Sequence, residues 1–398
     1  MTSSTFDTTE AGGLLRGRYR DESDPWWLIL DPILILSTLA IAAFGSILIY
    51  SATRGPATLT EPANTVFLER QISFALLGLG LAVVAAVIDV RRMRSLLPLA
   101  YVGLMVILLG ILQFGANING ARAWYRLGGF TFQPSEPGKI VLILVLAAVF
   151  STEEVSFRRL AGGLALSGGV IFLILQQPDL GTILVYIAVT AVMIMLSTVR
   201  VRYIVLLVLV ALTAVTMIFQ SDVLKDYQKV RLTVFVLDDD AIAELGPDAA
   251  PVASNAEQSQ IAIGNGGIFG EGLFEGPQTG SNLVPEQQTD FIFSVAGEEL
   301  GFRGAGILLL LFGVLGFRVW RIAVRATDQF DRLVAVGVMS MFVFQVFQSA
   351  GMTMGIMPVT GIPMPLVSYG GSSMLTSMVA LGLVLGVHRR RFDYPLRA

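Results

Sequence analysis

The chain contains no cysteine and only one histidine among its 398 residues. The absence of thiols excludes disulfide bonds, cysteine nucleophiles and zinc sites built on cysteine. The single histidine, His388, lies in an arginine-rich stretch near the C-terminus, so a histidine-based triad or metal centre is not expected. Any general base must therefore be a carboxylate or, as a weaker alternative, a lysine.

Charged residues are also scarce. They make up 14% of the chain, whereas 54% is hydrophobic and the mean hydropathy is +0.71. Soluble globular domains typically carry about 25% charged residues. The composition therefore predicts an all-α polytopic integral membrane protein. No cleavable signal peptide is evident, because residues 1–24 are polar and the first apolar stretch is long enough to remain as an anchor.

Ten apolar stretches approach the length of about twenty residues that a helix needs to cross a bilayer. Helices are expected at about 30–51, 71–89, 95–114, 134–151, 160–177, 181–198, 201–219, 301–320, 333–355 and 372–388. One long connection remains at about 220–300. The expected organisation is a disordered cytoplasmic tail over 1–24, a membrane domain over 25–390 and a cytoplasmic tail over 391–398.

The orientation follows from the positions of arginine and lysine. Placing the N-terminus in the cytoplasm puts most of the 27 basic residues on that side, as the positive-inside rule requires. Both termini are then cytoplasmic. The connections at 115–134, 176–179, 220–300 and 356–371 face outside.

The long outer loop divides into two parts. Its stretch 238–257 is acidic and rich in alanine and proline, and we expect it to be flexible. The glycines of 264–272 do not match a dinucleotide-binding fingerprint. We expect them to let the backbone approach a bulky ligand or a partner chain.

A group of charged residues follows the third helix on the outer side. Arg122, Arg126 and Lys139 contradict the positive-inside tendency, which suggests that they hold an anion such as a phosphate. The alternative is that these side chains only reach to the membrane surface and pair with Glu136. Ser135 is expected to cap the helix that follows.

Asp290 is the strongest candidate for a general base. It lies beside an apolar run at the end of the long loop. An ionised carboxylate near a bilayer is energetically costly unless it is solvated, paired with a positive charge or used for chemistry. We expect Asp290 in the first turn of a helix that Thr289 caps. The alternative is that Asp290 only stabilises that helix through its dipole.

Two further outer segments carry polar residues. Asp179 precedes the sixth helix and can cap it, so a structural role is at least as probable as a catalytic one. The segment 357–373 holds three prolines and is expected to be non-helical. Non-helical backbone at membrane depth occurs only where protein buries it or where it lines a water-filled cavity. It could serve equally as a structural plug or as a wall of the substrate site.

Taken together, five motifs resemble those of the SEDS family of shape, elongation, division and sporulation proteins, over about residues 30–390. They are Asn119-Gly120-Ala121-Arg122-x-Trp124, Gln133-Pro134-Ser135-Glu136, Gln177-Pro178-Asp179-Leu180-Gly181-Thr182, Pro285-Glu286-x-x-Thr289-Asp290-Phe291-Ile292-Phe293 and Ser368-Tyr369-Gly370-Gly371-Ser372-Ser373. The stretch 358–363 resembles the elongation-type RodA subfamily more than the division type. The chain departs from the family's usual residues at Glu271, Gln288 and Ser349.

The resemblance implies a peptidoglycan glycosyltransferase of the bacterial cytoplasmic membrane. Such an enzyme polymerises lipid II at the outer face and works with a class B penicillin-binding protein. Asp290 occupies the position of the family's essential aspartate. Membrane lipids surround the helices, and no nucleic acid is expected as a partner. The residues expected to contact substrate are Arg122, Glu136, Lys139, Asp179, Gln278, Glu286, Tyr369, Ser372 and Ser373.

The expected reaction is a direct displacement. Asp290 takes the proton of an acceptor hydroxyl, while Arg122 and Lys139 hold the pyrophosphate leaving group, with or without Mg²⁺ or Mn²⁺ and without an organic cofactor. Three alternatives remain open: a division-type polymerase, a lipid II flippase and a non-catalytic scaffold. We expect the penicillin-binding protein to dock on the helices at 301–320 and 333–355, where small residues allow close packing in lipid. These are Gly313, Gly316, Ala335 and Gly337.

Overall fold

The computed structural model describes residues 30–55, 64–118, 121–128, 130–220 and 249–392. The expected tail at 1–24 and nearly all of the tail at 391–398 lie outside these ranges. Helices form at all ten expected positions: α1 (Pro32–Thr53), α2 (Val66–Val87), α3 (Leu97–Phe114), α4 (Ser135–Phe150), α5 (Phe157–Leu175), α6 (Leu180–Met195), α7 (Val201–Gln220), α12 (Ile292–Val324), α13 (Gln329–Thr353) and α14 (Gly371–Arg390). The polytopic helical fold is confirmed.

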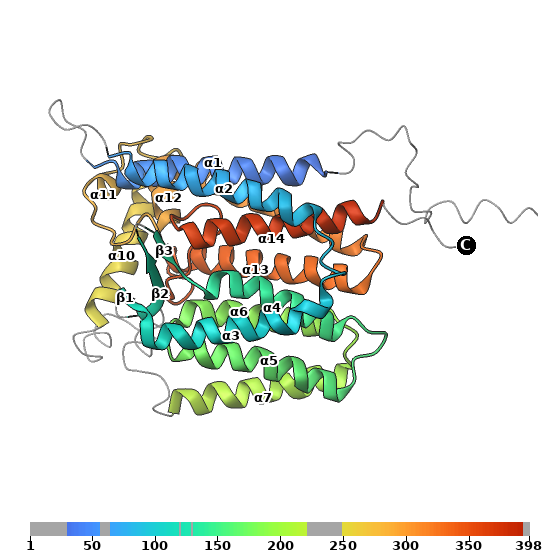
Figure 1. Ribbon diagram of the computed structural model, residues 1–398. Helices are drawn as coiled ribbons and strands as arrows, with labels where there is room; N and C mark the ends of the chain where they lie inside the picture. Colours follow the sequence, from blue (N-terminus) through green and yellow to red (C-terminus); the bar gives the residue numbers. More distant parts are fainter. Residues whose placement is uncertain (1–29, 56–63, 119–120, 129, 221–248, 393–398) are drawn as a thin grey trace, which may run out of the picture.

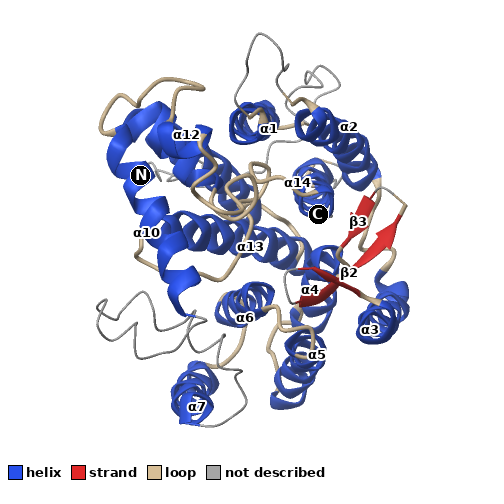
Figure 2. Cartoon of the chain, turned by 90° about the vertical axis from the view of Figure 1, so that its left-hand side faces the viewer, coloured by secondary structure: helices blue, strands red, loops and turns tan. Residues whose placement is uncertain are grey.

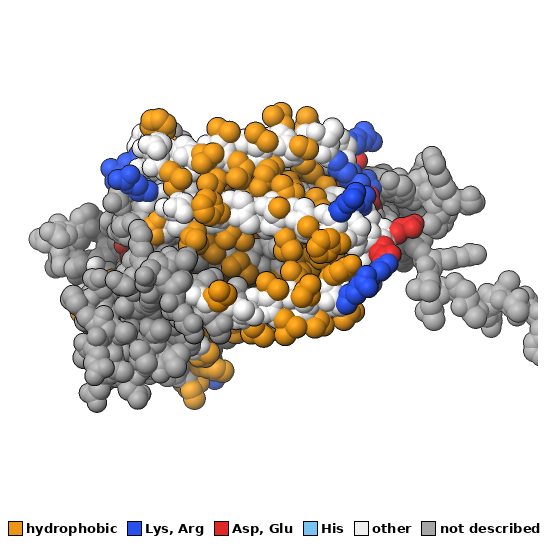
Figure 3. Space-filling view, turned by 90° about the horizontal axis from the view of Figure 1, so that it is seen from below, with side chains coloured by type: hydrophobic (Ala, Val, Ile, Leu, Met, Phe, Trp, Pro, Cys, Tyr) orange, Lys and Arg blue, Asp and Glu red, His pale blue; other side chains and the backbone are white. Residues whose placement is uncertain are grey.

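Length and apolarity single out the helices that can cross a membrane. Within the described residues, α1, α2, α3, α5, α12, α13 and α14 are long and apolar enough, and α6 and the first part of α7 are shorter apolar helices. Figure 3 shows hydrophobic side chains along the middle of the molecule and Lys and Arg toward its ends. This is the distribution that a surrounding bilayer requires.

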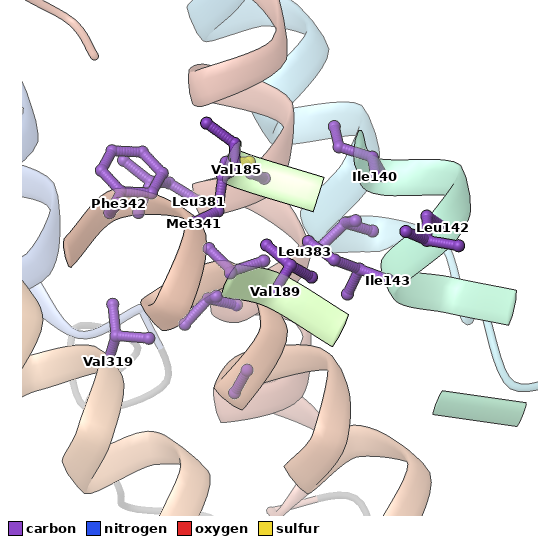
Figure 4. Packing of buried hydrophobic residues seen from close by; sticks show 14 of the residues in the cluster. Ile140, Leu142, Ile143, Val185, Val189, Val319, Met341, Phe342, Leu381 and Leu383 are labelled. Atoms are coloured by element: carbon purple, nitrogen blue, oxygen red, sulfur yellow. The ribbon is translucent and has the colours of Figure 1, made fainter. Parts of the chain in front are cut away.

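Helices α13 and α14 form the centre of the bundle. Their most apolar stretches are 78% buried, against 22% for α2 and α3, and the other helices surround them (Figures 1 and 2). Side chains from α4, α6, α12, α13 and α14 meet in the core, among them Ile143, Val189, Met341 and Leu383 (Figure 4). The peripheral α7 lies at the edge of the bundle (Figure 2).

A small antiparallel sheet covers one end of the bundle. Its strands are β1 (Ala116–Ile118), β2 (Ala121–Leu127) and β3 (Phe130–Phe132), in the order β1-β2-β3. The sequence did not predict this sheet, because its strands are short and two of them have only three residues. We call this end of the bundle the sheet end. The first residue of α1 and the last of α14 lie at the opposite end (Figure 1).

The long connection also contributes helices to the sheet end. Helix α10 covers Ala249–Gly266 and the short α11 covers Pro277–Gly280. The predicted flexibility of 238–257 is therefore wrong for 249–257, while 238–248 lies outside the described residues. Helix α10 packs on the beginning of α12. This tertiary contact supplies the stability that the local composition lacks.

The glycine-rich segment after α10 packs against the chain itself. A Cβ atom at Gly266 or Gly270 would collide with the α12 backbone at Gly297 or Glu299. The close approach is thus to α12, and not to the ligand or partner chain that we expected. Helix α12 is interrupted at Gly301, where φ of 64° and ψ of −166° are outside the helical range. Glycine adopts this conformation without the steric cost of a side chain.

Buried ion pairs tie the helices together at the end opposite the sheet. Arg390 donates to both carboxylate oxygens of Asp331, at 3.1 and 2.8 Å, and both side chains are only 2% exposed. Arg318 contacts Asp31 in the same bidentate way, at 3.1 and 2.6 Å. The first pair joins α14 to α13, and the second joins α12 to the start of α1.

We expect Asp331→Ala to destabilise the protein, because it leaves the Arg390 charge buried without its closest partner. Removing one member of a buried pair typically costs roughly 3 kcal/mol or more. The measurement is the thermal unfolding midpoint of the detergent-solubilised protein. The matched control is Glu154→Gln, which breaks an ion pair with Arg200 in which both side chains are 54% exposed. Equal midpoints for the two variants would contradict this account.

Candidate functional site

Asp290 lies in a tight turn immediately before α12. The carbonyl of Glu286 accepts from the backbone N–H groups of Thr289 and Asp290, at 3.0 and 3.1 Å. The helix begins at Ile292, so Asp290 precedes its first turn. Thr289 does not cap α12, because its hydroxyl donates back to Glu286. The predicted cap is therefore wrong, and the turn itself holds the half-buried Asp290 side chain in place.

The Asp290 turn is attached to the segment before α14. The N–H of Tyr369 donates to the carbonyl of Gln288 at 2.9 Å. The predicted stretch 357–373 is non-helical as far as residue 370, whereas residues 371–373 already belong to α14. Within it, Ser368 accepts from the N–H of Met364 at 2.8 Å. The ring of Tyr369 packs edge-on against Phe67 of α2, with centroids 5.0 Å apart. Buried contacts thus fix this irregular backbone beside Asp290.

Gln133 connects three of the motifs. Its N–H donates to the Ser372 hydroxyl at 3.0 Å, and its side-chain amide donates to Asp179 at 2.9 Å. Asp179 also accepts from the N–H and the hydroxyl of Thr182, at 3.0 and 2.8 Å, and so caps α6. The predicted capping role of Asp179 is confirmed. Segments far apart in the sequence therefore meet at Gln133, through its backbone N–H and its side-chain amide.

Glu136 and Lys139 form a buried ion pair in the first turns of α4. The Lys139 ammonium lies 2.6 Å from the Glu136 carboxylate, and the two side chains are 2% and 4% exposed. The charge of Lys139 is therefore compensated by Glu136, as the alternative interpretation of this cluster expected. The preceding Ser135 does not cap α4, since Pro134 holds the cap position and the buried Ser135 hydroxyl has no hydrogen-bond partner among the described residues.

Arg122 projects from the sheet. Alternate residues of a strand share one face, so Arg122, Trp124 and Arg126 lie on the same side of β2, and both arginines are exposed. On the other side, the Tyr125 hydroxyl donates to the carbonyl of Ile107 at 2.9 Å. Burial raises the pKa of Tyr125, which keeps this donor protonated. The two exposed guanidinium groups can meet an anion that approaches the sheet end.

The remaining candidates differ in their exposure to solvent. Glu286 is exposed at the start of the turn, and Gln278 is half-buried in α11. Ser373 is buried in the first turn of α14. Contacts thus link the Asp290 turn, Tyr369, Ser372 and Asp179 into one assembly. Gln278 lies in α11 of the long loop, and Arg122 lies on the sheet.

Within the described ranges, no group of three or more histidine, aspartate or glutamate residues is placed to hold a metal ion. These side chains alone therefore provide no ready cation site, and no chemical step is assigned to Mg²⁺ or Mn²⁺.

Sequence reasoning missed several of the residues that build this site. Gln133 was part of a motif but was given no role, and Gln287 and Glu298 were not singled out. All three donate or accept hydrogen bonds that hold loops in place. The signal that could have found Glu298 is an acidic side chain inside an apolar helix, which requires polar partners.

Comparison with known proteins places the chain among its relatives. The family model described as "Cell cycle protein", for FtsW, RodA and SpoVE, matches residues 32–392. The chain is 36% identical to stage V sporulation protein E of Bacillus subtilis, over 90% of this chain and 97% of that protein. It is 35% identical to the peptidoglycan glycosyltransferase MrdB of Escherichia coli K12 (91% and 94%) and to a probable peptidoglycan glycosyltransferase FtsW of Trichlorobacter lovleyi (90% and 92%).

Comparison with solved structures identifies relatives of the same kind. A structure described as a peptidoglycan synthase complex that coordinates polymerization and crosslinking matches with a TM-score of 0.74 and 33% identity, over 91% of this chain and 98% of that chain. RodA of Thermus thermophilus matches with a TM-score of 0.67 and 33% identity, over 92% and 99%. With the fold, the motifs and these likenesses in agreement, the chain belongs to the FtsW/RodA/SpoVE family, the SEDS proteins.

Proposed function

We propose that this chain, by its family a peptidoglycan glycosyltransferase, polymerises lipid II into β-1,4-linked glycan strands with Asp290 as the general base. The sheet end would face outside the bacterial cytoplasmic membrane, and both termini would lie in the cytoplasm. The observation that carries the proposal is the attachment of the Asp290 turn to the Tyr369–Ser372 segment, which in turn contacts Gln133. Hydrogen bonds thereby connect motifs from four parts of the chain, one of which carries Asp290.

Asp290 is suited to remove the acceptor proton. The acceptor sugar's 4-hydroxyl attacks the anomeric carbon of a second lipid-linked glycan, and Asp290 takes its proton as the new bond forms. The bond from the anomeric carbon to the pyrophosphate breaks in the same step. Because an α-linked donor gives a β-linked product by a single inversion, no covalent sugar intermediate and no second carboxylate are required.

The leaving pyrophosphate requires positive charge. We assign this charge to Arg122 and Arg126 on β2, because both side chains are exposed and accessible to an anion. Lys139 could take part only by sharing its contact with Glu136, because the pair is closed and buried. We therefore assign the larger share of anion binding to Arg122. Stabilising the charge that develops on a leaving group is often the largest catalytic contribution.

We further propose an elongation role. The segment Pro358-Val359-Thr360-Gly361-Ile362-Pro363 supports it through its resemblance to RodA, while the overall identities to FtsW, SpoVE and MrdB relatives are too similar to separate the types. Within this segment Thr360 is buried, and its carbonyl lies against Gly181 of α6. The segment thus packs against the beginning of α6, as either a structural plug or a wall of the site would.

We expect Asp290→Asn to lower the rate of lipid II polymerisation by roughly 10²- to 10⁴-fold, the usual contribution of a general base. The asparagine keeps the shape of the side chain but cannot take the proton. The measurement is glycan-strand formation from purified lipid II, together with the thermal unfolding midpoint. Glu257→Gln, at an exposed carboxylate on α10, is the matched control and should polymerise normally. Polymerisation at the wild-type rate by Asp290→Asn would remove it from the base role.

The Glu136–Lys139 pair allows a second test. Lys139→Met alone should lower the unfolding midpoint, because it leaves the Glu136 charge buried without its partner. The double variant Glu136→Gln with Lys139→Met removes both charges and should restore most of the stability. If the pair is structural, the double variant also polymerises lipid II. A stable double variant that cannot use the lipid-linked donor would instead return Lys139 to pyrophosphate binding.

An apolar groove between α12 and α13 supports the proposal that a transpeptidase partner docks on this chain. The groove has a volume of about 320 Å³, and its lining includes Gly313, Gly316, Phe347 and Met354. No atom lies within 4 Å of a Cβ built at Gly313 or Gly316. A partner's membrane helix could therefore approach closely, as association in lipid depends on van der Waals fit.

Two of the small residues expected at this interface belong to the bundle instead. Ala335 is fully buried, and a Cβ at Gly337 would lie 2.6 Å from the Ile143 side chain of α4. Their predicted contact with a partner is wrong, because α13 is central in the bundle and other helices cover most of its surface. Gly313 and Gly316 remain as the candidates.

We expect Gly313→Leu to weaken co-purification of a class B penicillin-binding protein, because the leucine fills the groove. Gly168→Leu on α5 is the matched control: Gly168 is exposed and has no atom within 4 Å of a built Cβ. Both variants should fold, and only the first should lose the partner. Unchanged co-purification by Gly313→Leu would locate the interface elsewhere.

A further inference from the structure

A buried carboxylate that the reaction does not use lies beneath the long loop. Glu298 is fully buried in the first part of α12, eight residues after Asp290. It accepts from the N–H of Gln278 at 2.7 Å, and from the N–H and the hydroxyl of Thr279 at 2.9 and 2.6 Å. A buried charge is retained only when such partners compensate for its lost solvation. The carboxylate thus fastens α11 to α12.

The contact continues from α11 to the Asp290 turn. The Thr279 carbonyl accepts from the side-chain amide of Gln287 at 3.1 Å, and the same amide donates to the carbonyl of Ala52 at 2.9 Å. Gln287 is buried and lies inside the turn that the Glu286 carbonyl closes. A chain of hydrogen bonds therefore runs from Glu298 through Thr279 to Gln287, within three residues of Asp290.

The first part of α12 joins both ends of this series of hydrogen bonds. Helix α12 is regular from Ile292 to the break at Gly301, so one short helical segment follows the Asp290 turn and also carries Glu298. The outer end of α1 supports the same segment, because the Ser51 hydroxyl donates to the neighbouring Glu299. The Asp290 turn is thus held by Gln287 on one side and by Tyr369 on the other.

We propose that Glu298 is a positioning residue for Asp290: through Thr279 and Gln287 it fixes the turn that carries the base, an inference that rests on the proposed function. A misplacement of about 1 Å in a reacting group can cost roughly 100-fold in rate. Loss of this contact therefore lowers kcat. The KM for lipid II changes little, because Glu298 is buried under the loop and does not reach substrate.

The test compares Glu298→Gln with wild type in steady-state polymerisation of purified lipid II. The glutamine keeps the shape but presents an N–H₂ group to backbone donors, so α11 loses at least one contact. We expect kcat to fall at least about tenfold, within the range that misplacement causes, with KM within about twofold. The exposed Glu271→Gln in the same loop is the matched control. An unchanged kcat overturns the inference. So does a fall in kcat that is no larger than the fall in the fraction of folded protein.

A double-mutant cycle separates positioning from general support of the fold. Gln287→Leu removes the last link and should lower kcat similarly. Because both side chains act through Thr279, the combined variant should lose less than the product of the two single effects. Multiplicative losses contradict this chain of hydrogen bonds. If Glu298→Gln fails to fold, wild-type kcat in Gln287→Leu still contradicts it.

Asp290→Asn distinguishes the two levels of failure. If Asp290→Asn is inactive while Glu298→Gln and Gln287→Leu keep wild-type kcat, only the positioning role is wrong. If Asp290→Asn polymerises normally, the proposed base fails and the positioning role fails with it.

Discussion

Hydrogen bonds from buried amide and carboxylate side chains to backbone groups hold the irregular segments at the sheet end. Non-helical backbone near a bilayer must have its polar groups satisfied by protein or by water in a cavity. Here Gln287 and Gln348 meet that requirement, with Gln348 donating to the carbonyl of Pro358 at 2.8 Å. Without such contacts, neither the turn before α12 nor the segment before α14 could keep its position.

The bundle beneath these segments supplies rigidity. The buried α13 and α14 present apolar side chains to their neighbours, and the ion pairs of Arg390 and Arg318 close the opposite end. Defined features limit the helices at the sheet end: Asp179 caps the start of α6, and Gly301 interrupts α12. A carboxylate on a turn is thereby fixed between stable elements, which is what a general base requires.

The sequence predicted those parts of the structure that long local patterns encode. Ten apolar runs predicted the ten helices. The choice of Asp290 as the candidate base followed from the scarcity of other residues that could act as one. The sheet and α10 were missed because their stability comes from tertiary packing. The burial of Gly337 and Ala335 depends on the central place of α13 in the bundle, where α4, α6 and α12 cover most of its surface. The roles of Gln287 and Glu298 depend on contacts between loops, which spacing alone does not reveal.

The central claim is that one anchored carboxylate at the sheet end catalyses glycan polymerisation. Its most direct test is incubation of the purified full-length chain with purified lipid II in detergent, with and without a class B penicillin-binding protein, followed by separation of the products by length. Detergent removes the two membrane faces, so a flippase would leave lipid II unchanged. The account predicts glycan strands that disappear with Asp290→Asn. Lipid II that stays monomeric under both conditions would contradict it.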